Sequence, residues 1–156
     1  MPLATSLYDW LLFLHILAAT VWLGGLVTIS LLVTLVLRSQ DADLVKRLLD
    51  GMRLVGPTVL GLPMFVLLGF GIWMVIHSDA WNFGQGWVIA GLCLFAAAFV
   101  IGLAFQGRPG MAAQRALEAG NREEVFRQFR RWSWGMRAIA VVLVVALWDM
   151  VAKPGL

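Results

Sequence analysis

Two histidines are the residues of this chain whose chemistry stands out. His15 and His77 are its only imidazoles, and each lies in or at the end of a long apolar run. A ring inside hydrocarbon needs a polar partner, and two imidazoles from different helices are typical ligands of b-type haem or of copper. His15 follows Trp10 by five residues, which is about 7 Å of helical rise, whereas His77 lies four residues before Trp81. The sequence predicts a haem or metal ligand at His15, with His77 as a second ligand.

A structural role is the alternative for both histidines. His15 would then hydrogen-bond a backbone carbonyl or a threonine, and His77 would lie in water at the membrane interface. Trp22 shares one helical face with His15 and is counted with it as a cofactor-binding candidate.

Two arginines on the other side of the membrane from the histidines are further candidates. Arg53 and Arg137 both lie at or just within the edges of apolar runs there. Each guanidinium either extends to the interface or pairs with an anion such as a haem propionate or a lipid phosphate. Soft thioether ligands for copper are available at Met74 and Met150.

Signatures of catalysis are missing from the sequence. It contains no HExxH or CxxC motif, no phosphate-binding glycine loop and no serine–histidine–aspartate set. Acidic residues in the middle of the apolar runs, which proton-coupled carriers use, are missing too. No catalytic residue is assigned, and an enzyme is not expected.

Four apolar runs must position these residues: 7–37, 54–77, 87–105 and 132–151. Each reaches the roughly 20 residues that cross about 30 Å of hydrocarbon. With 61% hydrophobic and 13% charged residues, the chain is typical of an integral membrane protein. The sequence predicts an all-α, transmembrane four-helix bundle in which residues 1–156 form a single integral membrane domain.

Basic residues indicate the orientation. Eleven of the twelve lysines and arginines lie in the connections 38–53 and 107–137, and only Lys153 lies on the other side. By the positive-inside rule those connections are cytoplasmic and both termini lie outside. The net charge of +3 is explained in this way, so the bilayer is the expected partner and nucleic acid is not.

The cytoplasmic connections carry helical patterns of their own. Residues 41–52 predict an amphipathic helix, 111–119 predict a second after a break at 107–110, and 122–132 predict an extension that runs into the fourth span. The short segment 78–86 makes the second and third spans antiparallel neighbours. Small residues form two stripes that allow helices to approach closely. The approaching helix can belong to the same bundle, to a second copy in a homo-oligomer or to a membrane-complex partner. The first stripe is Thr20, Gly24 and Thr28, and the second is Gly91, Ala98 and Gly102.

The first span, LHILAATVWLGGLVTISLL, resembles the opening helix of bacterial CopD (copper-resistance) and HemJ (haem-pathway) membrane proteins. It is equally similar to an uncharacterised "predicted integral membrane protein" family with four spans, which the segments GPTVLGLPMFVLLGFGIWMV and WVIAGLCLFAAAFVIGLAFQGRP resemble most. The likeness implies a bacterial inner-membrane protein, and likeness to HemJ implies haem or porphyrin handling at His15. The HemJ histidine–lysine motif has no counterpart near Gln85, so its oxidase activity is not expected.

The leading hypothesis is therefore a membrane haem- or metal-binding protein, active in electron transfer or in the handling of haem or copper. The alternative is a non-catalytic accessory or assembly subunit of a membrane complex.

Overall fold

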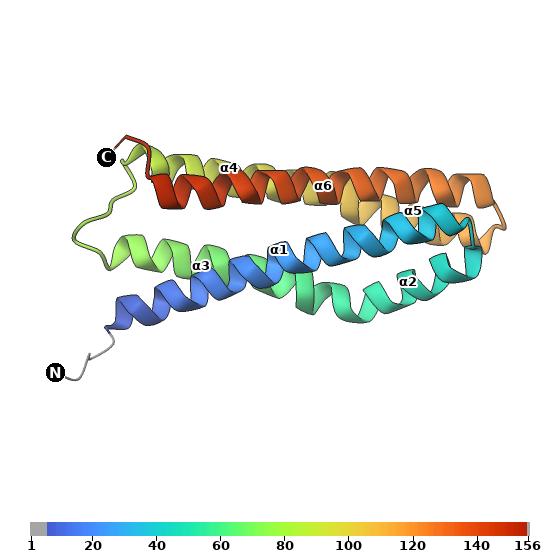
Figure 1. Ribbon diagram of the computed structural model, residues 1–156, viewed down its shortest axis with the longest axis horizontal. Coiled ribbons are helices and arrows are strands. Elements are labelled where there is room, and N and C mark those ends of the chain that lie inside the picture. The colour runs from blue at the N-terminus through green and yellow to red at the C-terminus, as the bar shows by residue number, and fades with distance from the viewer. Residues whose placement is uncertain (1–5, 156) are drawn as a thin grey trace.

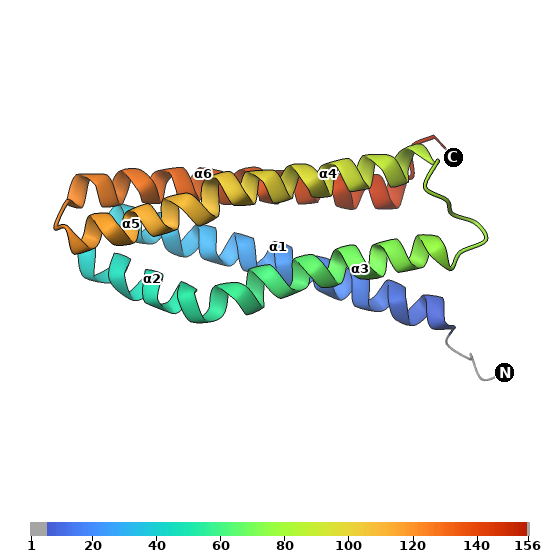
Figure 2. The same ribbon diagram turned by 180° about the vertical axis from the view of Figure 1, so that it is seen from behind.

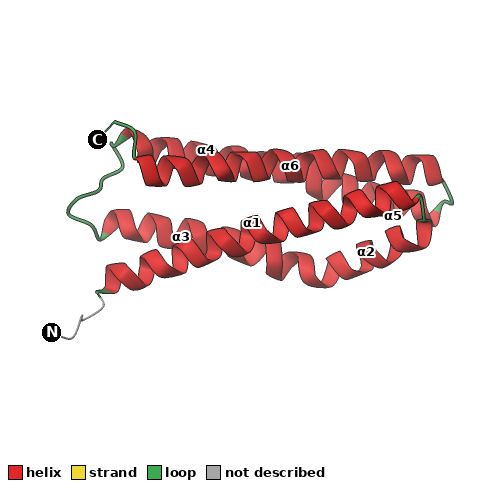
Figure 3. Ribbon diagram, viewed as in Figure 1, coloured by secondary structure: helices red, strands yellow, loops and turns green. Residues whose placement is uncertain are grey.

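The computed structural model describes residues 6–155, and within them the chain is all helix, without a strand (Figures 1 and 3). The elements are α1 (Leu7–Ser39), α2 (Ala42–Gly56), α3 (Leu62–Ile76), α4 (Gly86–Gly102), α5 (Arg108–Glu118) and α6 (Arg122–Ala152). Two π-helical segments join them end to end: η1 (Pro57–Gly61) between α2 and α3, and η2 (Leu103–Gly107) between α4 and α5. The result is four long apolar helices, each able to span a membrane. The predicted four-helix membrane bundle is confirmed.

Each of the two π segments begins at or is soon followed by a proline. The break predicted at residues 107–110 is wrong, because the helix continues through η2 into α5. Pro109 lies in the first turn of α5, and Pro57 occupies the same place in η1. Proline has no N–H to donate to the carbonyl four residues earlier. A π segment also lacks the regular α-helical hydrogen bonds, so the missing proline bond falls where the α-helical pattern is already interrupted. A proline therefore changes the pitch of these helices without ending them.

The helices are longer than a bilayer is thick. The 33 residues of α1 extend about 50 Å, against about 30 Å of hydrocarbon. The excess lies at the end formed by α2, α5 and the start of α6, called the basic end here because the arginine-rich connections lie there (Figure 1). The other end, with residues 77–85 and both ends of the described chain, is called the aromatic end.

The tightest packing lies toward the basic end. Fully buried side chains of α1, α2 and α6 meet there with alanines of α5, and Arg122 Nη2 ties the two connections by donating to the Gln40 carbonyl over 3.0 Å. These residues form the core: Leu26, Val33, Val45, Ala113, Val125, Phe129, Met136 and Ile139. Burial of apolar faces between protruding helices explains why α2 and α5 are amphipathic.

The four long helices pack as two pairs that share one seam. α1 packs on α3, α4 packs on α6, and α1 and α6 join the pairs. Helices α3 and α4 are antiparallel, as the short connection predicts, and Figure 2 shows them on the same face of the bundle. Their side chains line two cavities that lie between them. We call the α3–α4 side the open side of the bundle, because cavities and not close packing separate these two helices.

Candidate functional site

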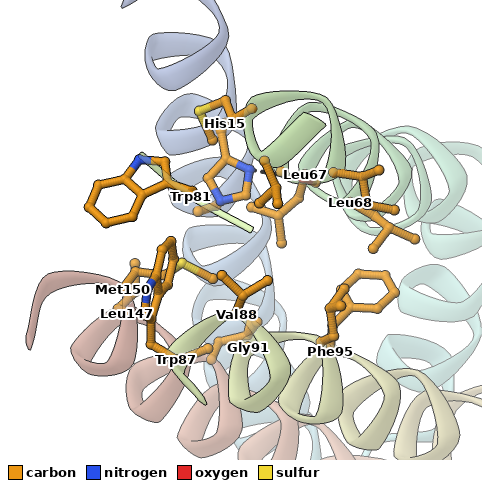
Figure 4. A pocket seen from close by; sticks show the side chains of 18 of the residues that line it. His15, Leu67, Leu68, Trp81, Trp87, Val88, Gly91, Phe95, Leu147 and Met150 are labelled. Carbon is orange, nitrogen blue, oxygen red and sulfur yellow. Dashed lines mark hydrogen bonds between the residues drawn. The ribbon is translucent and has the colours of Figure 1, made fainter. Parts of the chain in front are cut away.

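His15 lies in a pocket between the helices, in the half of the bundle toward the aromatic end (Figure 4). The half-buried ring comes from α1, and its Nδ1 lies 2.8 Å from the backbone carbonyl of Leu67 in α3. A carbonyl only accepts, so Nδ1 carries the proton and donates it to Leu67. In the neutral imidazole, Nε2 then keeps a free lone pair.

A glycine makes this contact possible. Gly71 follows Leu67 by one helical turn, and a Cβ placed on it would lie 2.9 Å from His15 Cε1 and 3.3 Å from Nδ1. Both distances are shorter than ordinary van der Waals contact. Only a residue without a side chain lets the imidazole reach the α3 backbone at this level, so the sequence of α3 sets the orientation of the ring.

The pocket around His15 is small and apolar, with a volume of about 130 Å³. Leucines, valines and aromatic rings of α1, α3, α4 and α6 form most of its wall. Two thioethers also line it, from Met74 of α3 and Met150 of α6. The structure thus brings an imidazole and two methionines from three different helices into one cavity, which their separation in the sequence does not reveal.

A second, larger cavity of about 560 Å³ lies toward the basic end between the two π segments. Trp22 and Arg53 both line it, and Trp22 packs against Phe95 with ring centroids 6.1 Å apart. Phe95 in turn lines the His15 pocket. This aromatic pair therefore forms the partition between the two cavities.

The structure separates the residues that the sequence grouped as one site. His77 caps α3 as an exposed residue whose Nε2 accepts from Trp73 Nε1 at 3.4 Å, and it lines neither cavity. It lies six residues beyond Gly71, about 9 Å along the helix, so it is not brought to His15. Arg137 is exposed and donates to Thr34 Oγ1 at 3.0 Å, away from both cavities. Only His15 among the five candidates lines the smaller pocket.

Buried polar groups also lie at the aromatic end. Asp149 of α6 is 3% exposed, and its Oδ2 has no hydrogen-bond partner; the same holds for the buried Nε1 of Trp87. Lys153 lies over the rings of Trp81 and Trp87, with Nζ 4.1 Å and 5.6 Å from their centroids. A carboxylate near a helix end is typically solvated, but the rotation of α6 turns Asp149 inward.

The residues described contain no group of three or more histidine, cysteine or acidic side chains able to hold a metal ion.

A family model described as predicted integral membrane protein (DUF2269) matches residues 9–154. The chain belongs to this family. The match includes His15, the larger cavity and all residues that line the smaller pocket except Tyr8. No curated protein and no solved structure matches the chain.

Proposed function

We propose that this membrane protein binds copper in the smaller pocket, with His15 Nε2 as the nitrogen ligand, and that its role is copper handling. The observation that carries the proposal is the hydrogen bond from His15 Nδ1 to the Leu67 carbonyl. Histidines that bind metals almost always donate their other ring N–H to a carboxylate, a carbonyl or water, which fixes the tautomer and the ring. His15 is held in that way before any ligand arrives.

The remaining donors favour soft copper(I). Thioether sulfur selects copper(I), imidazole also binds copper, and Met74 and Met150 line the same pocket as His15. A volume of about 130 Å³ suits one ion with its ligand atoms. The apolar wall would exclude water and competing hard cations, which prefer oxygen ligands.

Haem b is the second candidate, with His15 as an axial ligand. Pockets for molecules of drug size enclose about 300–1,000 Å³, so a porphyrin needs more room than this pocket offers. The observation in its favour is that α3 and α4 face each other across cavities while each packs on another helix. Their separation would enlarge the pocket without breaking the α1–α3 or α4–α6 packing.

Metal analysis and an oxidised-minus-reduced absorption spectrum on the same detergent-purified sample test the proposal. Cells are supplied with copper and with haem precursor, and wild type is compared with His15→Ala and with the control His77→Ala. We expect one copper per chain in wild type and His77→Ala, and none in His15→Ala. A Soret band in wild type that is absent from His15→Ala would show that the ligand is haem b and not copper. Neither copper nor haem in wild type would refute the proposal and favour the accessory-subunit interpretation.

A further inference from the structure

The larger cavity, which the copper proposal does not use, has one charged residue in its wall. Arg53 of α2 lies in the part of the wall toward the basic end, one helical turn after Leu49, and no aspartate or glutamate lines the cavity. Within residues 6–155, Arg53 takes part in no ion pair; the pair found there joins Arg127 and Glu124. An exposed guanidinium beside an apolar cavity lacks an anion of opposite charge, and bidentate binding of phosphate is the interaction for which arginine is best suited.

The rest of the cavity is apolar and long. Its lining residues run from Leu49 of α2 through η1 to Met64 of α3. The part between Arg53 and Met64 covers eleven residues or about 16 Å of helix, which is close to half of a 30 Å hydrocarbon core. Opposite, Ala98, Phe99 and Leu103 of α4 and η2 form the wall. Space is open beside both π segments, since a Cβ added at Gly61 or Gly107 would have no neighbour within 4 Å.

We infer that this cavity binds one anionic phospholipid of the adjacent leaflet, with its phosphate on Arg53 and one acyl chain between η1 and η2. Charge complementarity selects an anionic head group, and the length and apolar wall of the cavity match an acyl chain. The cavity lies on the α3–α4 side of the bundle, where a lipid can enter from the bilayer without unfolding any helix. The two π segments line the cavity on opposite sides, and π segments frequently occur at functional sites.

Native mass spectrometry of the delipidated protein, in micelles doped with phosphatidylglycerol or with phosphatidylcholine of the same acyl chains, tests the head-group contact. We expect one phosphatidylglycerol retained per chain and about tenfold less phosphatidylcholine. Arg53→Gln should reduce phosphatidylglycerol about tenfold, to the phosphatidylcholine level, because a charge-assisted hydrogen bond is lost. Arg47→Gln is the matched control, an exposed arginine of the same helix outside the cavity, and should retain the lipid.

A second pair of variants tests the acyl-chain contact. Gly61→Leu fills the cavity and should reduce retention of phosphatidylglycerol at least tenfold. Gly24→Leu, on an exposed face of α1 with equally free surroundings, should not. Equal retention of both lipids, equal loss in Arg47→Gln and Arg53→Gln, or unchanged retention in Gly61→Leu would overturn the inference. So would a dimer in place of the lipid-bound monomer. Copper content of the same samples reports separately on His15, so failure of one proposal is distinguishable from failure of the other.

Discussion

Replacing Gly71 with alanine perturbs the orientation of His15 without touching the histidine itself. The added methyl would lie 2.9 Å from His15 Cε1 and 3.3 Å from Nδ1, so the ring must move away from the Leu67 carbonyl. Gly69, on another face of α3, offers the control, because a Cβ there would have no neighbour within 4 Å. Both substitutions make the same chemical change in the same helix.

The two substitutions should change the free energy of unfolding in opposite directions. In Gly69→Ala the helix gains up to about 1 kcal/mol of propensity. In Gly71→Ala that gain is opposed by the lost hydrogen bond, about 1 kcal/mol, and by overpacking of about 1–3 kcal/mol. The two variants should therefore differ by about 2–4 kcal/mol, or roughly 6–12 °C in Tm for a chain of this size. Loss of the carbonyl that orients the imidazole should lower copper affinity by about 10–100-fold.

Thermal unfolding in a mild detergent measures the stability difference, and competition with a copper(I) chelator measures the affinity. We expect Gly71→Ala to unfold at the lower temperature and to lose copper to the chelator first. Equal Tm values for the two variants would refute the placement of His15 against Gly71. Unequal Tm values with equal copper affinity would keep the placement and refute the role of His15 as a ligand.

Three further substitutions test other contacts by the same unfolding assay. Trp22→Ala removes the partition between the cavities and should lower stability by about 3–5 kcal/mol; a Tm within 2 °C of wild type would contradict this packing. Gly135→Ala places a methyl inside the side chain of Phe105 and should cost at least about 1–3 kcal/mol, so an unchanged Tm would contradict the close approach of α6 and η2. Asp149→Leu removes a buried carboxyl without a partner and should stabilise by about 1–3 kcal/mol, whereas the exposed Asp79→Leu should change stability by less than about 0.5 kcal/mol; equal effects would contradict the burial of Asp149.

Hydropathy and length predict the fold class here because a bilayer permits few alternatives. Three of the four apolar runs lie within a long helix, and the run 54–77 ends one residue beyond its helix, which ends at Ile76. The same runs do not predict how those helices continue. Gly-Pro and Pro-Gly pairs at residues 56–57 and 109–110 have the local pattern of turns. The structure instead has the π segment η1 from Pro57 and the start of α5 at 109–110, directly after η2, since packing on α1 and α6 holds the helices together.

The site was less predictable, because it depends on helix rotation and depth. An imidazole in an apolar run suggests a partner for His15, but nothing local identifies the Leu67 carbonyl, 52 residues away. His77 and His15 are similar in type and differ in depth and direction, which only the packing of α1 on α3 decides. Asp149 and Trp87 resemble interfacial residues in sequence, and both face inward because α4 and α6 pack closely around Gly91.

The shared seam of α1 and α6 gives the bundle one direction in which it can deform. Rotation of the two helix pairs about this seam changes the distance between α3 and α4, and it leaves the α1–α3 and α4–α6 packing intact. The force that acts on the open side is the lateral pressure of the surrounding lipid. We therefore expect the volume of both cavities to depend on the thickness and composition of the bilayer, in which case the membrane would act on the protein as an effector as well as a solvent.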